Sequence, residues 1–162
     1  MIIQEDIESI YLYPAALIVP GKTAIVHTIL GSCVAVCLWD STLRTGGINH
    51  FMLPLWNGQG LASPKYGNIA IEKLFQKLIS NGSTQKNLIA KVFGGGEVLE
   101  NFSPHFNIGL RNIDIAHEIL QQFRIPILAE STGGKLGRKI TFNTGTGEVS
   151  QKYVKSSTNT FQ

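Results

Sequence analysis

Cysteines and charged residues are both scarce in this sequence. Its 162 residues include two cysteines, and Asp, Glu, Lys and Arg together make up 15%. The formal net charge is only +3, and the basic residues are scattered except for the group Lys135, Arg138 and Lys139. A nucleic-acid-binding surface usually has a denser basic stripe interleaved with aromatic residues. We therefore expect no nucleic-acid partner.

Long hydrophobic runs are also missing. No apolar run approaches the ~20 residues that a membrane-spanning helix requires, so membrane insertion is not expected. The first residues, MIIQEDIESIYLYP, include acidic side chains where a secretion signal would have lysine or arginine. These absences predict a soluble, cytoplasmic protein. Thiols stay reduced in the cytoplasm, so the two cysteines do not imply a disulfide.

Hydrophobic residues make up 43% of the chain, the balance of a globular protein. Helical spacing predicts a helix from about Tyr66 to Ser80, and a second that starts with Asn112 as its N-cap and ends near Phe123. Short runs rich in Val and Ile predict strands, which are expected at Ala15–Val19, Thr23–Leu30, Cys33–Trp39, Gly47–Leu53, Leu88–Phe93, Ile127–Glu130, Lys139–Asn143 and Glu148–Val154. No repeat or linker divides the chain. We expect one α+β domain over residues 1–155, with a mixed or antiparallel sheet, followed by a flexible tail over 156–162.

Both cysteines lie in the stretch LGSCVAVC, residues 30–37. On an extended strand their Cα atoms would be roughly 13 Å apart, too far for a disulfide. The same separation argues against a metal site built from Cys33, Cys37 and His50. Cys37 lies in mid-strand and is expected in the core. Cys33 follows Gly31-Ser32 at a strand end, where free backbone N–H groups can stabilise an oxyanion, so it is the candidate nucleophile.

A cysteine nucleophile needs a base, and His50 is the candidate. It lies in the strand after Cys33–Trp39, and symmetric pairing around the turn Asp40–Gly46 places it opposite Val36. A histidine in a strand is as readily a hydrogen-bonded core residue, so the pattern does not decide its role. The third member of a triad could be His27, Thr28 or Ser32. These residues predict a Cys–His hydrolase but no substrate.

Five ordered motifs narrow the prediction. LGSCVAVCLWD, GGINHFMLP, KVFGGGEVL, NIGLRN and AESTGG occur in this order, and together they resemble the CheD family of bacterial chemotaxis proteins over roughly residues 15–145. The resemblance implies a layered α/β sandwich, similar to that of bacterial deamidating toxins. It also implies a chemoreceptor glutamine deamidase with a Cys–His–Thr triad. The nucleophile falls on Cys33 and the histidine on His50, and the third member falls on Thr28, or on His27 if the register differs by one residue.

The resemblance further implies the cytoplasmic domains of chemoreceptors as substrates and a CheC-type phosphatase as a partner, without metal or cofactor. A non-catalytic adaptor that binds receptors or the phosphatase is the alternative function. Nothing in the sequence favours a cysteine peptidase. The run Gly94–Gly96 does not form a phosphate-binding motif and is expected to make tight turns beside the site. Ser131–Gly134 is expected either to line a substrate groove or to form a plain turn, and His105 and His117 to be surface or packing residues.

Overall fold

The computed structural model describes residues 6–97 and 107–155. Two α-helices, nine strands and one short 3-10 helix form within these ranges. In chain order they are β1 (Glu8–Tyr11), β2 (Leu17–Ile18), β3 (Ala24–Leu30), β4 (Val34–Asp40), β5 (Thr45–Asn49), α1 (Gly67–Ser80), η1 (Gln85–Asn87), β6 (Leu88–Gly94), α2 (Ile108–Gln122), β7 (Ile127–Thr132), β8 (Gly137–Asn143) and β9 (Val149–Val154).

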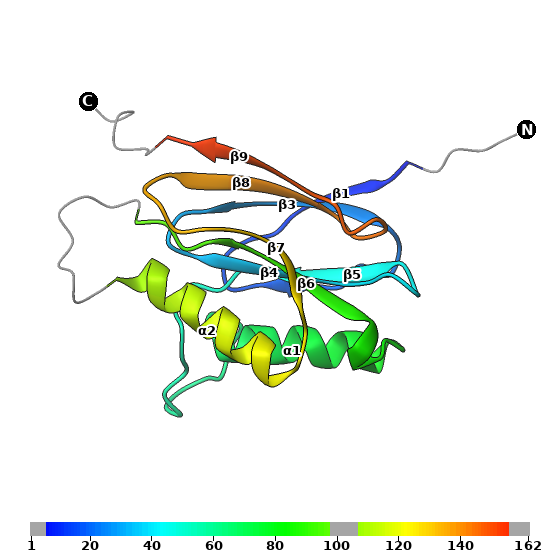
Figure 1. Ribbon diagram of the computed structural model, residues 1–162, viewed down its shortest axis with the longest axis horizontal. Coiled ribbons are helices and arrows are strands. Elements are labelled where there is room, and N and C mark those ends of the chain that lie inside the picture. The colour runs from blue at the N-terminus through cyan, green and yellow to red at the C-terminus, as the bar shows by residue number, and fades with distance from the viewer. Residues whose placement is uncertain (1–5, 98–106, 156–162) are drawn as a thin grey trace, which may run out of the picture.

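The strands form two sheets that stack on each other. One has the order β1-β3-β8-β9 and the other the order β2-β5-β4-β6-β7. Each sheet is mixed, because β1–β3 and β6–β7 are parallel pairs while the other pairs are antiparallel. Figure 1 shows three layers: the four-stranded sheet, the five-stranded sheet, and the two helices on the outer face of the latter. The predicted α+β sandwich is confirmed.

Strand β4 lies at the centre of the five-stranded sheet and is buried on both faces. Alternate residues belong to two core clusters, since successive side chains of a strand point to opposite faces. Val34, Val36 and Leu38 pack toward the helices, whereas Ala35 and Cys37 pack toward the four-stranded sheet. The expectation that Cys37 is a core residue is confirmed, because it is 1% exposed. Cys33 packs on the same face as Cys37 but remains partly exposed.

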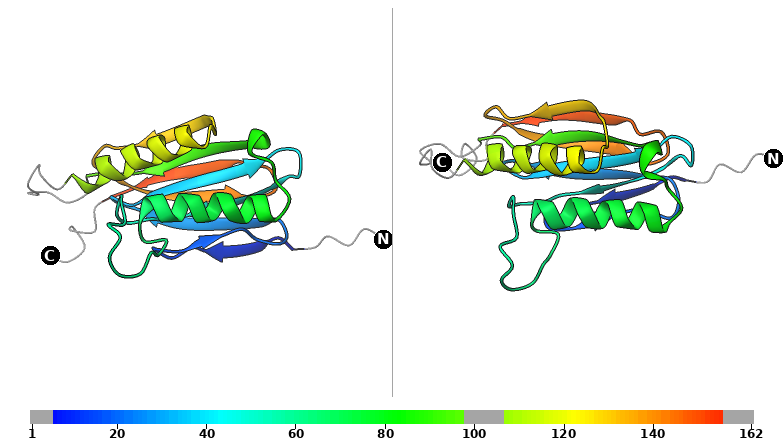
Figure 2. Two further views of the ribbon diagram at one scale, coloured as in Figure 1. Left: turned by 90° about the horizontal axis from the view of Figure 1, so that it is seen from below. Right: turned by 60° about the horizontal axis from the view of Figure 1, so that its bottom comes forward.

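The two helices lie side by side over the sheet, and the segment between β5 and α1 protrudes past them (Figure 2). Helix α1 ends where predicted: Asn81 is its C-cap, and Gly82 has φ +112°. Helix α2 begins earlier than predicted. Its N-cap is Asn107, whose Oδ1 accepts the N–H of Leu110 at 3.3 Å, so the expectation that Asn112 caps the helix was wrong. The motif NIGLRN holds two asparagines, and the first of them caps the helix, which places the second on its buried face.

Most strand predictions are confirmed to within a few residues, with two differences. Strand β1 was not predicted, because its four residues are mostly exposed and form a strand only by pairing with β3. Strands β7 and β8 are longer than the predicted strands Ile127–Glu130 and Lys139–Asn143, because β7 continues to Thr132 and β8 already begins at Gly137. The predicted tail 156–162 and His105 lie outside the described residues. In the described ranges neither α-helix is long and apolar enough to cross a membrane.

Candidate active site

Three segments meet at the end of the sandwich where β4 begins: residues 31–33, and the ends of β6 and β7 with the residues that follow them, 94–96 and 131–134. Gly94 has φ +108°, and a Cβ at this position would lie 2.2 Å from the carbonyl oxygen of Cys33. The same oxygen accepts the N–H of Gly95 at 2.8 Å, and the Gly31 carbonyl accepts the N–H of Gly96 at 3.0 Å. The prediction that Gly94–Gly96 makes tight turns beside Cys33 is therefore confirmed.

The pairing of β4 with the strand that carries His50 differs from the prediction by one residue. Cys37 pairs with Ile48, and Val34 pairs with Phe51, so His50 lies opposite Ala35 and not opposite Val36. The cause is the turn: Thr45 already pairs with Asp40, so the turn spans only residues 41–44, and its centre lies half a residue before that of the predicted turn. A one-residue shift moves a side chain to the other face of the sheet. In the observed register His50 faces the four-stranded sheet, on the same face as Cys33.

Cys33 and His50 are diagonal neighbours across the two strands. Diagonal positions on one face are about 7–8 Å apart at the backbone, within reach of a long side chain. The structure brings the two residues to the same face and the same end of the sheet. It does not join them, because no hydrogen bond links the Cys33 thiol to the imidazole. Catalytic hydrogen bonds are often long before substrate binds.

Thr28 makes the closest polar contact of the His50 side chain. Its Oγ1 lies 2.7 Å from Nδ1 of His50 and 2.7 Å from the carbonyl oxygen of Leu12. A threonine hydroxyl has one hydrogen, which it donates to the Leu12 carbonyl. Oγ1 must then accept the N–H of Nδ1. A neutral imidazole protonated at Nδ1 has a free electron pair on Nε2, which is the form that can act as a base.

His27 and Thr28 are neighbours in β3 but point to opposite faces of its sheet. His27 lies on the outer face, with Nε2 2.9 Å from Oγ of Ser9 and Nδ1 3.1 Å from Oγ1 of Thr141. Thr28 is fully buried between the sheets. Of the two residues that the resemblance left open as the third member, the structure brings only Thr28 into contact with His50.

The backbone of His50 is held by a bulge in the neighbouring strand. Its carbonyl accepts the N–H of Ala15 at 2.8 Å, and its N–H donates to the Ala16 carbonyl at 3.0 Å. Ala15 and Ala16 thus both lie opposite His50, which is the pattern of a β-bulge, and Ala15 is in the left-handed region at φ +67°. On the other side, Oδ1 of Asn49 accepts the N–H of Val36 at 2.9 Å. The sequence contains no signal for this bulge, because alanine rarely adopts a positive φ.

Burial sets the protonation of both candidate residues. His50 is 2% exposed, and burial lowers its pKa to about 4. Burial raises the pKa of the Cys33 thiol, while a hydrogen bond from the backbone N–H of Cys33 acts in the opposite direction. At neutral pH the resting pair is therefore an uncharged thiol and an uncharged imidazole. Burial also raises the pKa of Cys37, which keeps that thiol protonated and unreactive.

Two buried polar residues at this end were not identified as site residues from the sequence. Asn112 is fully buried, and its Nδ2 donates to the carbonyl oxygens of Ser32 at 2.9 Å and Met52 at 3.1 Å. Arg138 is 3% exposed and donates to the Gly133 carbonyl at 2.7 Å and to Oγ of Ser131 at 3.2 Å. The apparent basic group of the sequence is therefore not a surface patch at Arg138. Its side chain instead connects the turn 131–134 to β8.

His117 lies away from Cys33 and His50, on helix α2. Its side chain lies at the surface against β7, with Nε2 2.5 Å from Oε1 of Glu130, which fits the expectation of a surface or packing residue. Within residues 6–97 and 107–155, no group of three or more His, Cys, Asp and Glu side chains is arranged to hold a metal ion.

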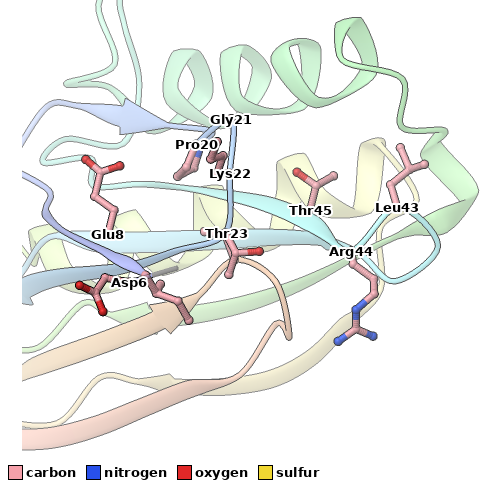
Figure 3. A pocket seen from close by; sticks show the side chains of 11 residues that line it. Asp6, Glu8, Pro20, Gly21, Lys22, Thr23, Leu43, Arg44 and Thr45 are labelled. Carbon is pink, nitrogen blue, oxygen red and sulfur yellow. The ribbon is translucent and has the colours of Figure 1, made fainter. Parts of the chain in front are cut away.

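An open groove lies at the opposite end of the sandwich, where β4 finishes (Figure 3). Strand β4 has seven residues, so roughly 20 Å separates this groove from Cys33. The residues around it are Asp6, Ile7, Glu8, Pro20, Gly21, Lys22, Thr23, Leu43, Arg44, Thr45 and Thr144. None of the predicted site residues lines this groove.

Comparison with known proteins identifies the family. The sequence model described as CheD, chemotactic sensory transduction, matches residues 52–153, more than half of the chain. A protein of Trichlorobacter lovleyi is 50% identical over 143 residues, which cover 88% of this chain and 89% of that protein. The chain belongs to the CheD family. The resemblance of the five motifs to CheD proteins is confirmed.

Other CheD proteins are similar over comparable lengths. A protein of Sulfurimonas denitrificans is 46% identical over 92% of this chain and 96% of its own. A protein of Rhodospirillum rubrum is 42% identical over 90% of this chain and 82% of its own. All three relatives are named probable chemoreceptor glutamine deamidase CheD. The family match starts after His50, but the Trichlorobacter alignment covers 143 of the 162 residues and so includes the CheD segment from Thr28 to His50.

Proposed function

We propose that this protein deamidates glutamine side chains in the cytoplasmic domains of chemoreceptors, with Cys33 as the nucleophile and His50 as the general base. Thr28 orients the imidazole. The observation that carries the proposal is the hydrogen-bond chain from His50 Nδ1 through Thr28 Oγ1 to the Leu12 carbonyl. This chain leaves Nε2 of His50 as the acceptor, on the face of the sheet that also carries Cys33. The names of the relatives supply the substrate class.

The reaction begins from the neutral pair. Nε2 of His50 takes the thiol proton as the sulfur of Cys33 attacks the carbon of the glutamine amide. A sulfur–carbon bond forms, and the electron pair of the carbonyl double bond moves to the oxygen. His50 then gives the proton to the nitrogen, the carbon–nitrogen bond breaks, and ammonia leaves a thioester on Cys33. Water activated by His50 hydrolyses the thioester to glutamate and restores the thiol.

Burial favours proton transfer that is concerted with attack. A permanent thiolate–imidazolium pair is disfavoured in this site, because the pKa of His50 is lowered to about 4 and that of Cys33 is raised. The low pKa makes the imidazolium a strong acid once it forms, which suits it to protonate the departing nitrogen. The site therefore generates its charges only as the substrate reacts.

The test is mass spectrometry of receptor cytoplasmic fragments after incubation with the wild type and with Cys33→Ala. We expect the wild type to convert specific glutamines to glutamates, and Cys33→Ala to convert none. Cys37→Ala is the matched control, because it removes the other thiol of the same strand from the core. It should be less stable but active. Full activity of Cys33→Ala would exclude the enzymatic proposal.

The same variant separates catalysis from binding. If Cys33→Ala still binds receptor fragments or a CheC-type phosphatase, the protein also acts as an adaptor, as the resemblance to the family implies. Co-purification of Cys33→Ala with each partner measures this directly.

A further inference from the structure

We propose that Asn112 is a positioning residue, which fixes the peptide group between Ser32 and Cys33 so that the N–H of Cys33 donates to the oxygen of the substrate amide. This inference rests on the function proposed above. Its basis is the side-chain amide of Asn112, fully buried on α2, which donates to the Ser32 carbonyl at 2.9 Å. That carbonyl belongs to the same peptide group as the N–H of Cys33.

Peptide geometry converts this hydrogen bond into an orientation. The described chain contains no cis peptide bond, and in a trans peptide the C=O and the N–H point in opposite directions. Because the Ser32 carbonyl points at α2, the N–H of Cys33 points away from α2, toward the face of the thiol. The hydrogen bond that opposes the rise in the Cys33 pKa comes from this N–H. Among the described residues no backbone carbonyl accepts it.

The second hydrogen bond of Asn112 holds the other strand. Its Nδ2 also donates to the Met52 carbonyl at 3.1 Å. Since Val34 pairs with Phe51, Met52 lies opposite Cys33, just beyond the last pair of the ladder. One amide group therefore joins the two strands that carry Cys33 and His50, where their own hydrogen bonds end.

Helix α2 gives this amide a fixed support. A Cβ at Gly109 would lie 2.4 Å from the carbonyl oxygen of Gly95, so the first turn of the helix packs directly on the glycine run beside Cys33. A donor carried by a packed helix is held more accurately than one carried by a loop. Oδ1 of Asn112 is buried without a hydrogen-bond partner in the part of the chain that the structure describes. A buried oxygen without a hydrogen bond lowers the stability of the fold, and such a loss is typical of residues kept for function.

The N–H of Cys33 should act on the chemical step and not on the binding of the substrate. As the sulfur–carbon bond forms, the electron pair of the carbonyl moves to oxygen, and the Cys33 N–H stabilises that oxyanion. When this electron pair re-forms the carbonyl double bond, the carbon–nitrogen bond breaks and ammonia leaves with the proton from His50. The N–H donates to a full negative charge only in the intermediate. Loss of its orientation should therefore lower kcat far more than it changes KM.

The experiment compares two variants with a control on the same helix. Asn112→Asp keeps the shape and removes both donors, and Asn112→Ala removes the side chain. Asn107→Ala removes the N-cap of α2 and so destabilises the same helix without touching Ser32 or Met52. For each variant we measure kcat and KM on a receptor fragment, and the rate at which iodoacetamide alkylates Cys33. Alkylation at sulfur needs the thiol and its base but forms no oxyanion.

Both Asn112 variants should lose about 100-fold in kcat, the usual effect of removing an oxyanion donor. KM and the alkylation rate should stay within about twofold of the wild type, and Asn107→Ala should keep its kcat. An unchanged kcat in the Asn112 variants would overturn the inference. A parallel loss of kcat and alkylation would overturn it as well, since it would show a displaced thiol. Either result leaves the proposed function intact, which fails only if Cys33→Ala retains activity.

If neither Asn112 variant folds, the orientation of the Cys33 N–H can be tested on the wild type. A receptor peptide with an aldehyde in place of the glutamine amide adds to the Cys33 thiol, and the sulfur–carbon bond leaves an oxygen where the oxyanion forms. In ¹⁵N-labelled protein, the amide proton of Cys33 should shift downfield when the adduct forms. An unshifted Cys33 amide would overturn the inference.

Discussion

The two ends of the sandwich differ in how their polar groups are arranged. Where β4 begins, the polar side chains are buried and joined by hydrogen bonds: Thr28 and Asn112 are fully buried, and His50 is 2% exposed. Where β4 finishes, the charged side chains around the groove are exposed, among them Lys22 and Arg44. The open groove is thus lined by exposed charged side chains, whereas the buried, hydrogen-bonded polar groups lie at the Cys33 end.

This difference favours the Cys33 end over the groove as the place for the proposed chemistry. The attack of a thiol on an amide needs a base in the right tautomer and donors aimed at the developing charge. Both depend on groups that cannot reorient, and burial together with hydrogen bonds to the backbone and to other side chains supplies this. The charged side chains around the open groove are exposed and are not held in one orientation in this way. We therefore expect perturbations of the Cys33 end to change activity and stability, and equal perturbations of the groove to change neither.

The largest expected effect is the acid sensitivity that His50 imposes on the fold. In the unfolded chain His50 has a pKa near 6.5, whereas burial lowers it to about 4 in the folded protein. As the pH falls from 7 to 4, the unfolded state binds the proton first, so the free energy of unfolding decreases. The loss due to His50 is about 3 kcal/mol. Urea unfolding at both pH values should show that His50→Gln loses less stability than the wild type by this amount.

His27→Gln is the matched control for this comparison, because His27 lies one residue before Thr28 but on the outer face. It should leave the acid sensitivity due to His50 in place. If His50→Gln shows the same loss of stability as the wild type between pH 7 and 4, the assignment of a buried neutral His50 is wrong.

The next effect concerns the residue that orients the imidazole. Thr28→Val keeps the shape but leaves the His50 Nδ1–H and the Leu12 carbonyl without their partner, and each unpaired buried group costs about 1–3 kcal/mol. We expect kcat to fall between about tenfold and 100-fold. Thr28→Ser retains the hydroxyl and should restore most of the rate. An active Thr28→Val would show that the hydroxyl does not set the tautomer of His50.

A smaller effect is expected from a single methyl group at the turn beside Cys33. Gly94→Ala adds a Cβ 2.2 Å from the Cys33 carbonyl, at φ +108°. Gly133→Ala has a comparable φ of +80°, but nothing lies within 4 Å of its Cβ. The steric contact should therefore make Gly94→Ala less stable than Gly133→Ala by about 1–3 kcal/mol in thermal unfolding. Equal stabilities would mean that the glycine run does not pack against the turn of Cys33.

The smallest effect is expected at the groove. Lys22→Ala combined with Arg44→Ala removes two exposed positive charges roughly 20 Å from Cys33. Deamidation of receptor fragments should stay within about twofold in kcat and KM, because these side chains neither contact the reacting atoms nor hold those that do. A large rise in KM would show that the groove end takes part in binding the receptor, and the comparison between the ends would have to be revised.

Much of the fold could be predicted because the apolar runs are unambiguous. The residues of β4 form a continuous hydrophobic segment, and alternation along β3 puts Thr28 inside and His27 outside. The exposed strand β1 could not be predicted, because its pairing with β3 depends on residues distant in sequence. The start of α2 was misplaced because either asparagine of NIGLRN is a good N-cap by residue type.

The candidate site was predicted in its residue types but not in its geometry. Cys33 and His50 follow from the strand-end position and from the motifs, yet a one-residue difference in the pairing register decided which face His50 occupies. The hydrogen bonds of Asn112 and the bulge at Ala15 both depend on contacts between residues that are distant in the sequence. Nothing local marks an asparagine in mid-helix as a donor to two strands, or an alanine as a residue with positive φ.

The most direct test of the central claim is to trap the covalent intermediate. A receptor peptide that contains a substrate glutamine is mixed with the wild type, quenched in acid within the first turnover, and the protein is digested and mapped by mass spectrometry. We expect an acyl group on Cys33 and none on Cys37. Turnover with an acyl group on another residue, or with no covalent species while Cys33→Ala remains active, would contradict this expectation.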